Sequence, residues 1–138
     1  MFEFNDIDYV SEKTDDITIS AYNELLDSEG KANRLWYYGV RIENNSDQRI
    51  CLLKKDFCIT DCNGNNFYDY SDGFHGELPV LEPGEYFDFE DTATLSTASA
   101  VLYGCCIARR DDGELLKVKL PLTDLFCGNN RNLSIKLN

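Results

Sequence analysis

Residues 35–43 read Leu35-Trp36-Tyr37-Tyr38-Gly39-Val40-Arg41-Ile42-Glu43 and carry the clearest structural signal in the chain. Every second side chain from Trp36 to Ile42 is apolar, and the charged Arg41 lies between them. Because successive side chains of a strand point to opposite faces, this run predicts a strand with one face in a core and the other in water. The polar run Asn44-Asn45-Ser46-Asp47 ends it with residues that favour turns.

The next run, residues 49–61, predicts a second strand with an irregularity. Ile50 and Leu52 share one parity, whereas Phe57 and Ile59 share the other. Since a one-residue slip moves every following side chain to the opposite face, we expect a bulge or break near Lys54-Lys55-Asp56.

Further short runs follow, separated by turn residues. Apolar residues alternate or cluster in the segments 17–19, 87–90, 116–120 and 133–137. In residues 100–108 both parities are apolar or small, which predicts a central strand covered on both faces. The turns are predicted at Asn63-Gly64-Asn65, Pro83-Gly84 and Asp111-Asp112-Gly113.

Helical periodicity is nearly absent. Only residues 22–26 and 122–126 allow a short helical turn, and the polar segment 23–33 predicts a mobile loop. Seven or eight short strands with turns between them predict an all-β sandwich of two antiparallel sheets. The length of 138 residues and the lack of a linker predict that residues 1–138 form one domain.

Charge restricts the classes of partner. The chain has 13 Lys and Arg against 25 Asp and Glu, a formal net charge of −12. Such a surface repels phosphate backbones and anionic membranes, and the only basic candidates are the pairs Lys54-Lys55 and Arg109-Arg110. We therefore expect no nucleic acid and no membrane as partner. A basic protein partner or a cation is favoured, although acidity can also serve solubility alone.

The start of the chain, Met1 to Asp8, carries carboxylates where a secretory signal has an apolar run. We therefore expect a cytoplasmic protein whose six cysteines are reduced. They do not have the short spacing of zinc sites, and Cys105 and Cys106 are neighbours that point to opposite strand faces. We predict no metal site and no cofactor, and interpret the cysteines as small core residues. They are Cys51, Cys58, Cys62, Cys105, Cys106 and Cys127.

Four segments resemble the ApaG family, in the order in which that family has them. They are residues 38–46, residues 52–64, the block Gly73-Phe74-His75-Gly76-Glu77-Leu78-Pro79-Val80-Leu81-Glu82-Pro83-Gly84-Glu85, and Leu120-Pro121-Leu122. The resemblance is clearest over residues 35–125 and implies an immunoglobulin- or fibronectin-III-like sandwich, in agreement with the strand count. The family has a G-x-G-x-x-G loop, and here its first glycine is replaced by Ser71. The chain therefore resembles a divergent member.

The glycine-containing loop is the candidate binding site. A phosphate cradle needs a helix N-terminus after the loop, and the extended run that follows Gly76 does not supply one. His75 is the only histidine and has no recognisable nucleophile beside it in the sequence, so we predict no catalytic residue. Aromatic residues near sandwich loops, here Tyr68, Tyr70, Phe74 and Tyr86, can form a recognition patch, whereas Phe67 and Phe87 are expected in the core. The predicted binding loop comprises Tyr70, Asp72, Gly73, Phe74, His75, Gly76 and Glu77.

These observations predict a non-enzymatic binding module that binds a protein partner and is itself a monomer or homodimer. The alternative is a small-ligand protein that binds a nucleotide, a pyrophosphate or a divalent cation. The resemblance associates that alternative with cation homeostasis.

Overall fold

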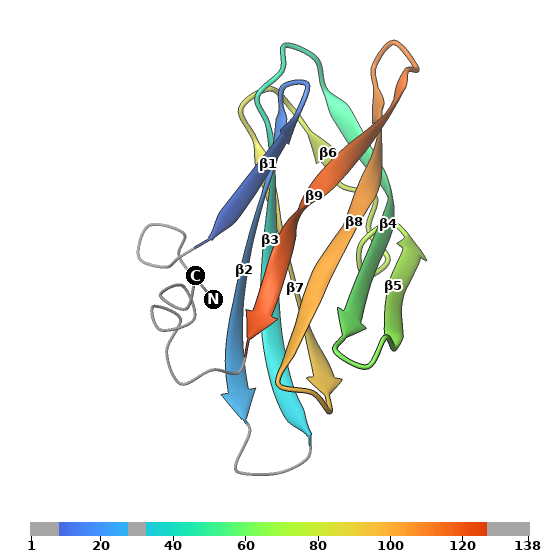
Figure 1. Cartoon of the computed structure of the whole chain (residues 1–138). Coiled ribbons are helices and arrows are strands. Elements are labelled where there is room, and N and C mark those ends of the chain that lie inside the picture. Colours follow the sequence, from blue (N-terminus) through green and yellow to red (C-terminus); the bar gives the residue numbers. More distant parts are fainter. Residues whose placement is uncertain (1–8, 28–32, 127–138) are drawn as a thin grey trace.

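The computed structural model describes residues 9–27 and 33–126. These residues form nine strands and two antiparallel sheets (Figure 1). The strands are β1 (Val10–Thr14), β2 (Ile17–Asp27), β3 (Arg34–Asn44), β4 (Ile50–Asp61), β5 (Asn66–Asp72), β6 (Val80–Leu81), β7 (Tyr86–Leu95), β8 (Ser99–Arg110) and β9 (Leu115–Phe126).

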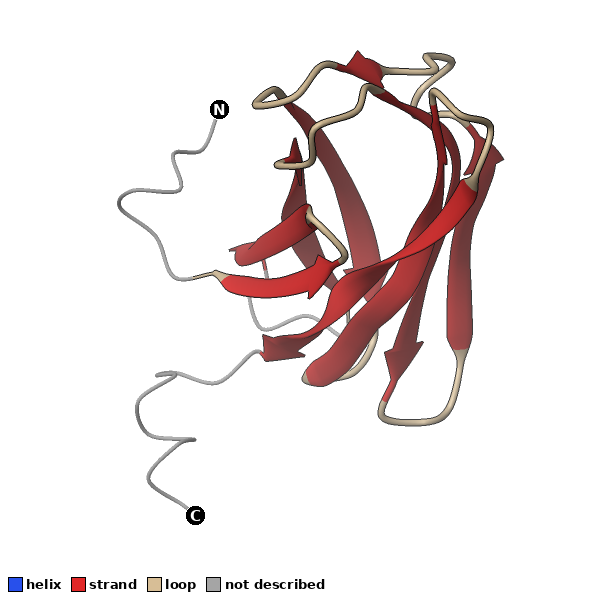
Figure 2. Ribbon diagram, turned by 90° about the horizontal axis from the view of Figure 1, so that it is seen from above, coloured by secondary structure: helices blue, strands red, loops and turns tan. Residues whose placement is uncertain are grey.

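The two sheets lie face to face, as Figure 2 shows in a view along the strands. One sheet has the order β1-β2-β3-β7, and the other has the order β5-β4-β8-β9 with the short β6 also paired to β4. The predicted all-β sandwich of two antiparallel sheets is confirmed. The strands that the sequence did not reveal include β1, which is mostly polar, and β6, which has two residues.

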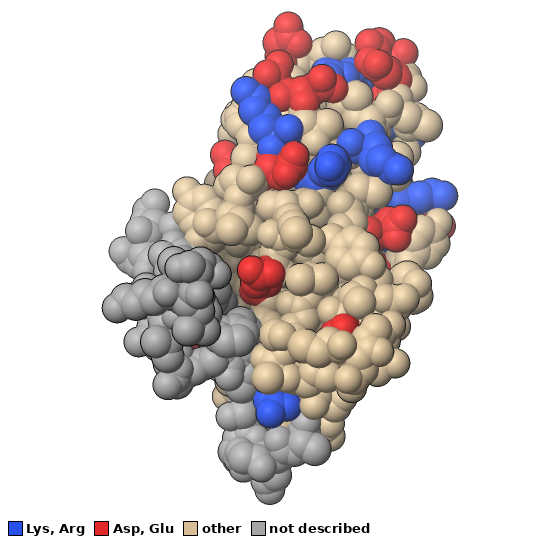
Figure 3. Space-filling view, viewed as in Figure 1, with Lys and Arg blue, Asp and Glu red and all other residues tan. Residues whose placement is uncertain are grey.

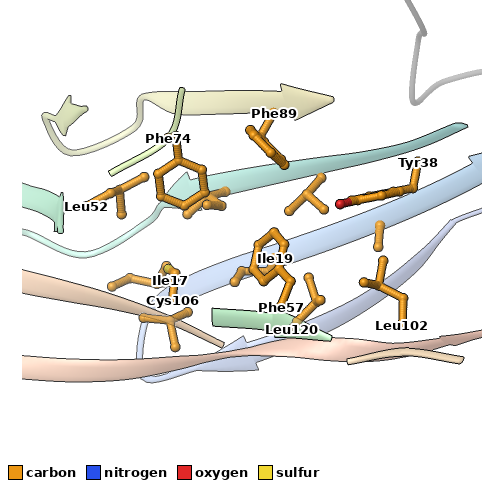
Figure 4. Packing of buried hydrophobic residues seen from close by; sticks show 14 of the residues in the cluster. Ile17, Ile19, Tyr38, Leu52, Phe57, Phe74, Phe89, Leu102, Cys106 and Leu120 are labelled. Atoms are coloured by element: carbon orange, nitrogen blue, oxygen red, sulfur yellow. The ribbon is translucent and has the colours of Figure 1, made fainter. Parts of the chain in front are cut away.

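The core lies between the sheets and follows the predicted alternation. Trp36, Tyr38, Val40 and Ile42 of β3 are all buried, and they face residues such as Phe57 of β4. Figure 4 shows apolar side chains from both layers meeting in this space. Burial of this apolar area is the main stabilising term of the fold, at about 25 cal/mol per Å².

The irregularity predicted in β4 is present and is a β-bulge at Leu53. Leu52 pairs with Ala108 and Lys54 pairs with Ile107, so Leu53 is the extra residue against β8. The bulge changes the parity of β4 and brings Lys55 as well as Phe57 to the inner face, where both are buried. This local slip therefore places a lysine inside the sandwich.

Two elements predicted from the sequence are wrong. Residues 22–26 and 122–126 do not form helical turns, because they continue the strands β2 and β9. Residues 23–27 likewise belong to β2 and not to a loop. The pairing of residues 23–27 with β3 overrides the weak preference of these residues for a helical turn or a loop. The remainder of the predicted loop, residues 28–32, and the alternation of residues 133–137 lie outside the described residues.

One open side of the sandwich is closed by contacts between the sheets. The Lys119 N–H of β9 donates to Thr14 Oγ1 of β1 at 3.1 Å, and the Asn23 side-chain amide of β2 donates to the Asp124 carbonyl at 2.9 Å. The outer edge of β9 is thus covered by the other sheet. We call these contacts the β1–β9 seam.

Candidate functional site

The glycine-containing loop follows β5 and closes on itself. Phe74 and Glu77 exchange two backbone hydrogen bonds of 2.8 and 3.0 Å, around His75 and Gly76. Both central residues have positive φ, 51° and 85°, which is the backbone of a type I′ turn. The Gly73 N–H donates to the Leu53 carbonyl at 2.7 Å. Three N–H groups of the loop are therefore used within the fold.

Gly73 is required by close packing within this loop. Its φ is +73°, and a Cβ there would lie 2.3 Å from the Glu77 carbonyl oxygen. The close backbone approach that a glycine permits thus brings the loop onto itself.

Phe74 anchors the loop from inside, which corrects its place in the predicted binding loop. Its side chain is 1% exposed and lies edge-to-face against Phe57, Phe87 and Phe89, with ring centroids 5.4 to 6.3 Å apart. A ring buried this deeply cannot contact a partner, so it supports the loop. Tyr70, Asp72, His75, Gly76 and Glu77 are exposed, as a binding loop requires.

His75 packs on the sandwich and has no catalytic partner among the described residues. Its ring stacks on Phe89 with centroids 4.8 Å apart, and its Nε2 lies 3.3 Å from the Glu90 carbonyl oxygen. A general base needs a nucleophile or an orienting carboxylate within hydrogen-bond reach. The geometry around His75 supplies a stacked contact in place of such a pair.

A buried polar cluster connects both sheets beneath this loop. Lys55 of β4 is 3% exposed and pairs with Asp69 of β5 at 2.9 Å. The Tyr38 hydroxyl of β3 donates to the other oxygen of Asp69 at 2.9 Å. The Lys55 ammonium also lies 4.0 Å from the ring centroid of Phe89 on β7. We call Tyr38, Lys55 and Asp69 the polar cluster, and since all its groups are paired, we interpret it as structural.

The polar cluster predicts how stability changes at alkaline pH. Burial, followed by the Asp69 carboxylate, raises the pKa of the Tyr38 phenol above its ordinary 10.0. Above pH 10 the unfolded chain releases this proton first, so the free energy of unfolding falls as pH rises. We expect the wild type to lose up to about 1.4 kcal/mol per pH unit more than Tyr38→Phe. Urea denaturation at a series of pH values above 10 measures the free energy of unfolding of both proteins. If it falls equally steeply with pH in the wild type and in Tyr38→Phe, the prediction is wrong.

The outer face of the five-stranded sheet carries an aromatic surface that includes Tyr68 and Tyr70 of the predicted recognition patch. Side chains here alternate with the core residues of β4, β5, β8 and β9. Several large ones are exposed, and we call four of them the tyrosine face: Tyr68 (71% exposed), Tyr70 (59%), Tyr103 (38%) and Leu122 (67%). The prediction that both faces of residues 100–108 are covered holds only in part on this side, where Cys105 is buried but Tyr103 of β8 is exposed.

A hollow of about 530 Å³ lies within this surface, beside Tyr68, Tyr103 and Leu122. Gly104 also lines it, at the point where the β8–β9 register shifts. The Tyr103 hydroxyl is hydrogen-bonded to Thr60 at 2.9 Å, which holds that wall in place. Figure 3 shows this side of the molecule: charged side chains gather toward its upper part, and the part below is largely uncharged.

The outer face of the other sheet differs. Arg41 of β3 forms a two-bond ion pair with Asp88 of β7, at 2.7 and 2.9 Å, and stacks on Tyr86 at 4.0 Å.

The structure also shows where the two phenylalanines predicted to lie in the core are placed. Phe87 packs against the core, as predicted, whereas Phe67 is 41% exposed at the sheet edge, where β5 has no further neighbour to cover it.

Neither a metal-binding cluster nor a membrane-spanning helix occurs in the part of the chain that the structure describes. No group of three His, Cys, Asp or Glu side chains there is arranged to hold a metal ion. No helix in the same residues is long and apolar enough to cross a membrane. Cys105 lines the hollow and Cys106 lies in the core, so the two point to opposite faces as predicted. Burial raises the pKa of the Cys106 thiol to about 12.

Comparison with known proteins gives consistent results. The sequence pattern of the ApaG domain matches residues 25–109. Protein ApaG of Brucella canis is 32% identical over 111 residues, which cover 80% of this chain and 85% of that protein. Protein ApaG of Maricaulis maris is 33% identical over 108 residues, with 76% and 83% covered.

Solved structures share the fold. A Bordetella pertussis structure named as an ApaA protein superposes with a TM-score of 0.78 at 21% identity, covering 83% of this chain and 96% of that one. A structural genomics target named SoR45 gives 0.76 at 21% identity, with 83% and 89% covered. Both sequence and fold thus agree with the resemblance seen in the glycine-containing block, and the chain belongs to the ApaG family.

Proposed function

We propose that this chain is a single-domain, non-enzymatic module that binds another protein through the tyrosine face. The observation that carries the proposal is the exposed aromatic surface on the outer side of β5 and β8, in a chain of net charge −12. Contiguous exposed apolar patches mark interaction sites, and tyrosine is enriched at interfaces because it offers rigid contact area. The hollow beside Tyr68 and Tyr103 would accept a large apolar side chain of the partner.

The binding surface extends from the tyrosine face to the exposed part of the glycine-containing loop. Tyr70 and Asp72 continue β5 toward the turn, and His75 and Glu77 form its exposed tip. Gly73 and Phe74 shape this tip from within, and Gly76 provides its turn. We place the activity in the cytoplasm, since the five described cysteines are free, as a reducing compartment would keep them.

The test compares variants of two outer faces. Tyr68→Ser with Tyr103→Ser removes the walls of the hollow, whereas Tyr86→Ser removes a similarly exposed tyrosine (54%) from the other sheet. Proteins captured from the native cell by the wild type should be lost from the double variant by at least about tenfold, because central aromatic side chains dominate interface energies. Tyr86→Ser should retain them. Identical capture by all three proteins would refute the assignment.

The small-ligand alternative has less support from the loop. Its N–H groups at Gly73, Phe74 and Glu77 are already bonded, and the carboxylates of Asp72 and Glu77 would repel a phosphate. Calorimetric titration with a dinucleoside polyphosphate, Mg²⁺ and Co²⁺ is therefore expected to give flat traces. Saturable heat with any of the three would favour the alternative.

A further inference from the structure

The pairing of β5 with β4 fixes which backbone groups of β5 are bonded to β4 and which point away from the sheet. Beyond the two ends of β5, the Asp61 N–H donates to the Asn65 carbonyl and the Gly73 N–H donates to the Leu53 carbonyl. In an antiparallel ladder, hydrogen-bonded and non-bonded pairs alternate. Asn65 and Gly73 are both odd-numbered and belong to the register in which Phe57 lies opposite Asp69, so the odd-numbered residues of β5 are the ones that bond to β4. The backbone N–H and C=O groups of Tyr68 and Tyr70 therefore point away from the sheet.

No described strand lies beyond this edge, on the right of Figure 1. Folded proteins usually protect edges with lysine, proline, a bulge or a covering segment. β5 pairs with β4 through seven consecutive residues without a register shift and contains neither lysine nor proline. By contrast, the β1–β9 seam covers β9, and the edge strand β7 carries Asp88, Glu90 and Asp91. β5 carries two carboxylates, and that of Asp69 is paired with Lys55. Of the long edge strands β5, β7 and β9, β5 is thus the least protected.

The side chains along this edge indicate what would pair with it. Phe67 projects toward the inner side at the sheet edge and is partly uncovered, so an apolar residue of an added strand would cover it. Tyr68 and Tyr70 project outward, and Asp56 lies opposite Tyr70 on β4. Aromatic faces beside a carboxylate attract Lys or Arg. An added strand should therefore alternate apolar and basic residues.

A second copy of this chain fits the edge less well. Pairing of β5 with itself would bring Asp69 and Asp72 of both copies to one shared edge, and like charges brought together across strands are destabilising. Both copies would also carry a net charge of −12. Charge complementarity thus favours a basic partner segment.

We propose that the partner adds an extended, antiparallel strand to β5, with basic residues facing Tyr68 and Tyr70 and apolar residues facing Phe67. This inference rests on the proposed function, and it specifies how the partner binds. Main-chain hydrogen bonds would supply affinity, and the alternating side chains would supply specificity.

The first test uses a capped peptide of alternating valine and lysine on the wild-type chain. At about 1 mM peptide, amide hydrogen exchange at Tyr68 and Tyr70 should slow, since even weak complexes are populated at that concentration. Methylating the lysine backbone nitrogens, which would face β5, should abolish the effect, whereas methylating the valine nitrogens should not. Replacing lysine by glutamate should abolish it as well. Unchanged exchange with the unmethylated peptide would overturn the proposal.

The second test uses a matched pair of variants on β5. Tyr70→Ala keeps the outward N–H, and Tyr70→Pro removes it while leaving the bonds to β4 intact, as proline does on an edge strand. Tyr70→Pro should bind the peptide roughly tenfold more weakly than Tyr70→Ala. Equal affinities would overturn strand addition. A wild-type dimer in sedimentation that Tyr70→Pro dissociates would overturn the basic segment as the occupant.

The two proposals fail in distinguishable ways. If the Tyr68→Ser and Tyr103→Ser variant loses its cellular partner while Tyr70→Pro and Tyr70→Ala retain it equally, protein binding stands and strand addition is wrong. If no variant changes capture, both are wrong.

Discussion

Gly104→Ala is expected to destabilise the protein by about 3 kcal/mol or more, a large share of the roughly 5–15 kcal/mol by which a folded domain is stable. Gly104 has a φ of +137°, and a Cβ there would lie 2.1 Å from the Asp56 carbonyl oxygen and 3.0 Å from Phe57 Cα. Both contacts are with the backbone of β4, which cannot rotate away as a flexible side chain can. The central pair β4–β8 would have to separate locally.

Gly113→Ala is the matched control for this experiment. Gly113 also has a positive φ, +92°, but a Cβ there would meet nothing within 4 Å. Its expected cost is only the backbone strain of about 1 kcal/mol. Urea denaturation of the two variants separates the cost of the clash with β4, present only at Gly104, from the cost of the positive φ, present at both glycines. Similar losses for both would show that the β4–β8 contact yields to an added methyl group.

Lys55→Met is expected to lower the free energy of unfolding by about 3 kcal/mol, because it leaves the half-buried Asp69 carboxylate without its cation. The ammonium of Lys55 bonds to Asp69 at 2.9 Å, and it also lies over the ring of Phe89 at 4.0 Å. Lys54→Met, at the exposed neighbouring position, should change stability by no more than about 0.5 kcal/mol. Thermal or urea denaturation measures both.

A combined variant tests whether the loss comes from the unpaired charge. Lys55→Met with Asp69→Leu and Tyr38→Phe replaces the polar cluster by apolar groups of similar size. Such replacements are often neutral, so most of the stability should return. If the triple variant remains as unstable as Lys55→Met, packing of the lysine stem and not charge pairing holds this region together.

The sequence predicts the parts of this fold that depend on periodicity. The alternation in residues 35–43 identifies β3, and the parity change after Leu52 predicts the bulge that the structure places at Leu53. Residues 22–26 and 122–126 were misassigned because their strand state comes from pairing with β3 and β8, which local pattern does not reveal.

The candidate site was predictable in part. The exposed residues of the glycine-containing loop follow from its composition, but the burial of Phe74 depends on three aromatic rings from β4 and β7. Tyr68 and Tyr70 of the tyrosine face follow from the aromatic residues near the loop, whereas for Tyr103 the only signal is the apolar residues at both parities of residues 100–108. That pattern equally predicts a second covering layer, so only the three-dimensional arrangement identifies an exposed surface.

The β1–β9 seam determines when the chain can finish folding. Its two hydrogen bonds join residues that lie 105 and 101 positions apart in the sequence. A nascent chain that ends before Leu115 lacks β9 entirely, and β8 then has an unpaired edge. Such long-range closure slows folding and leaves partly synthesised chains open to aggregation. The last of the described strands to be made, β9, is thus also the one that closes the sandwich.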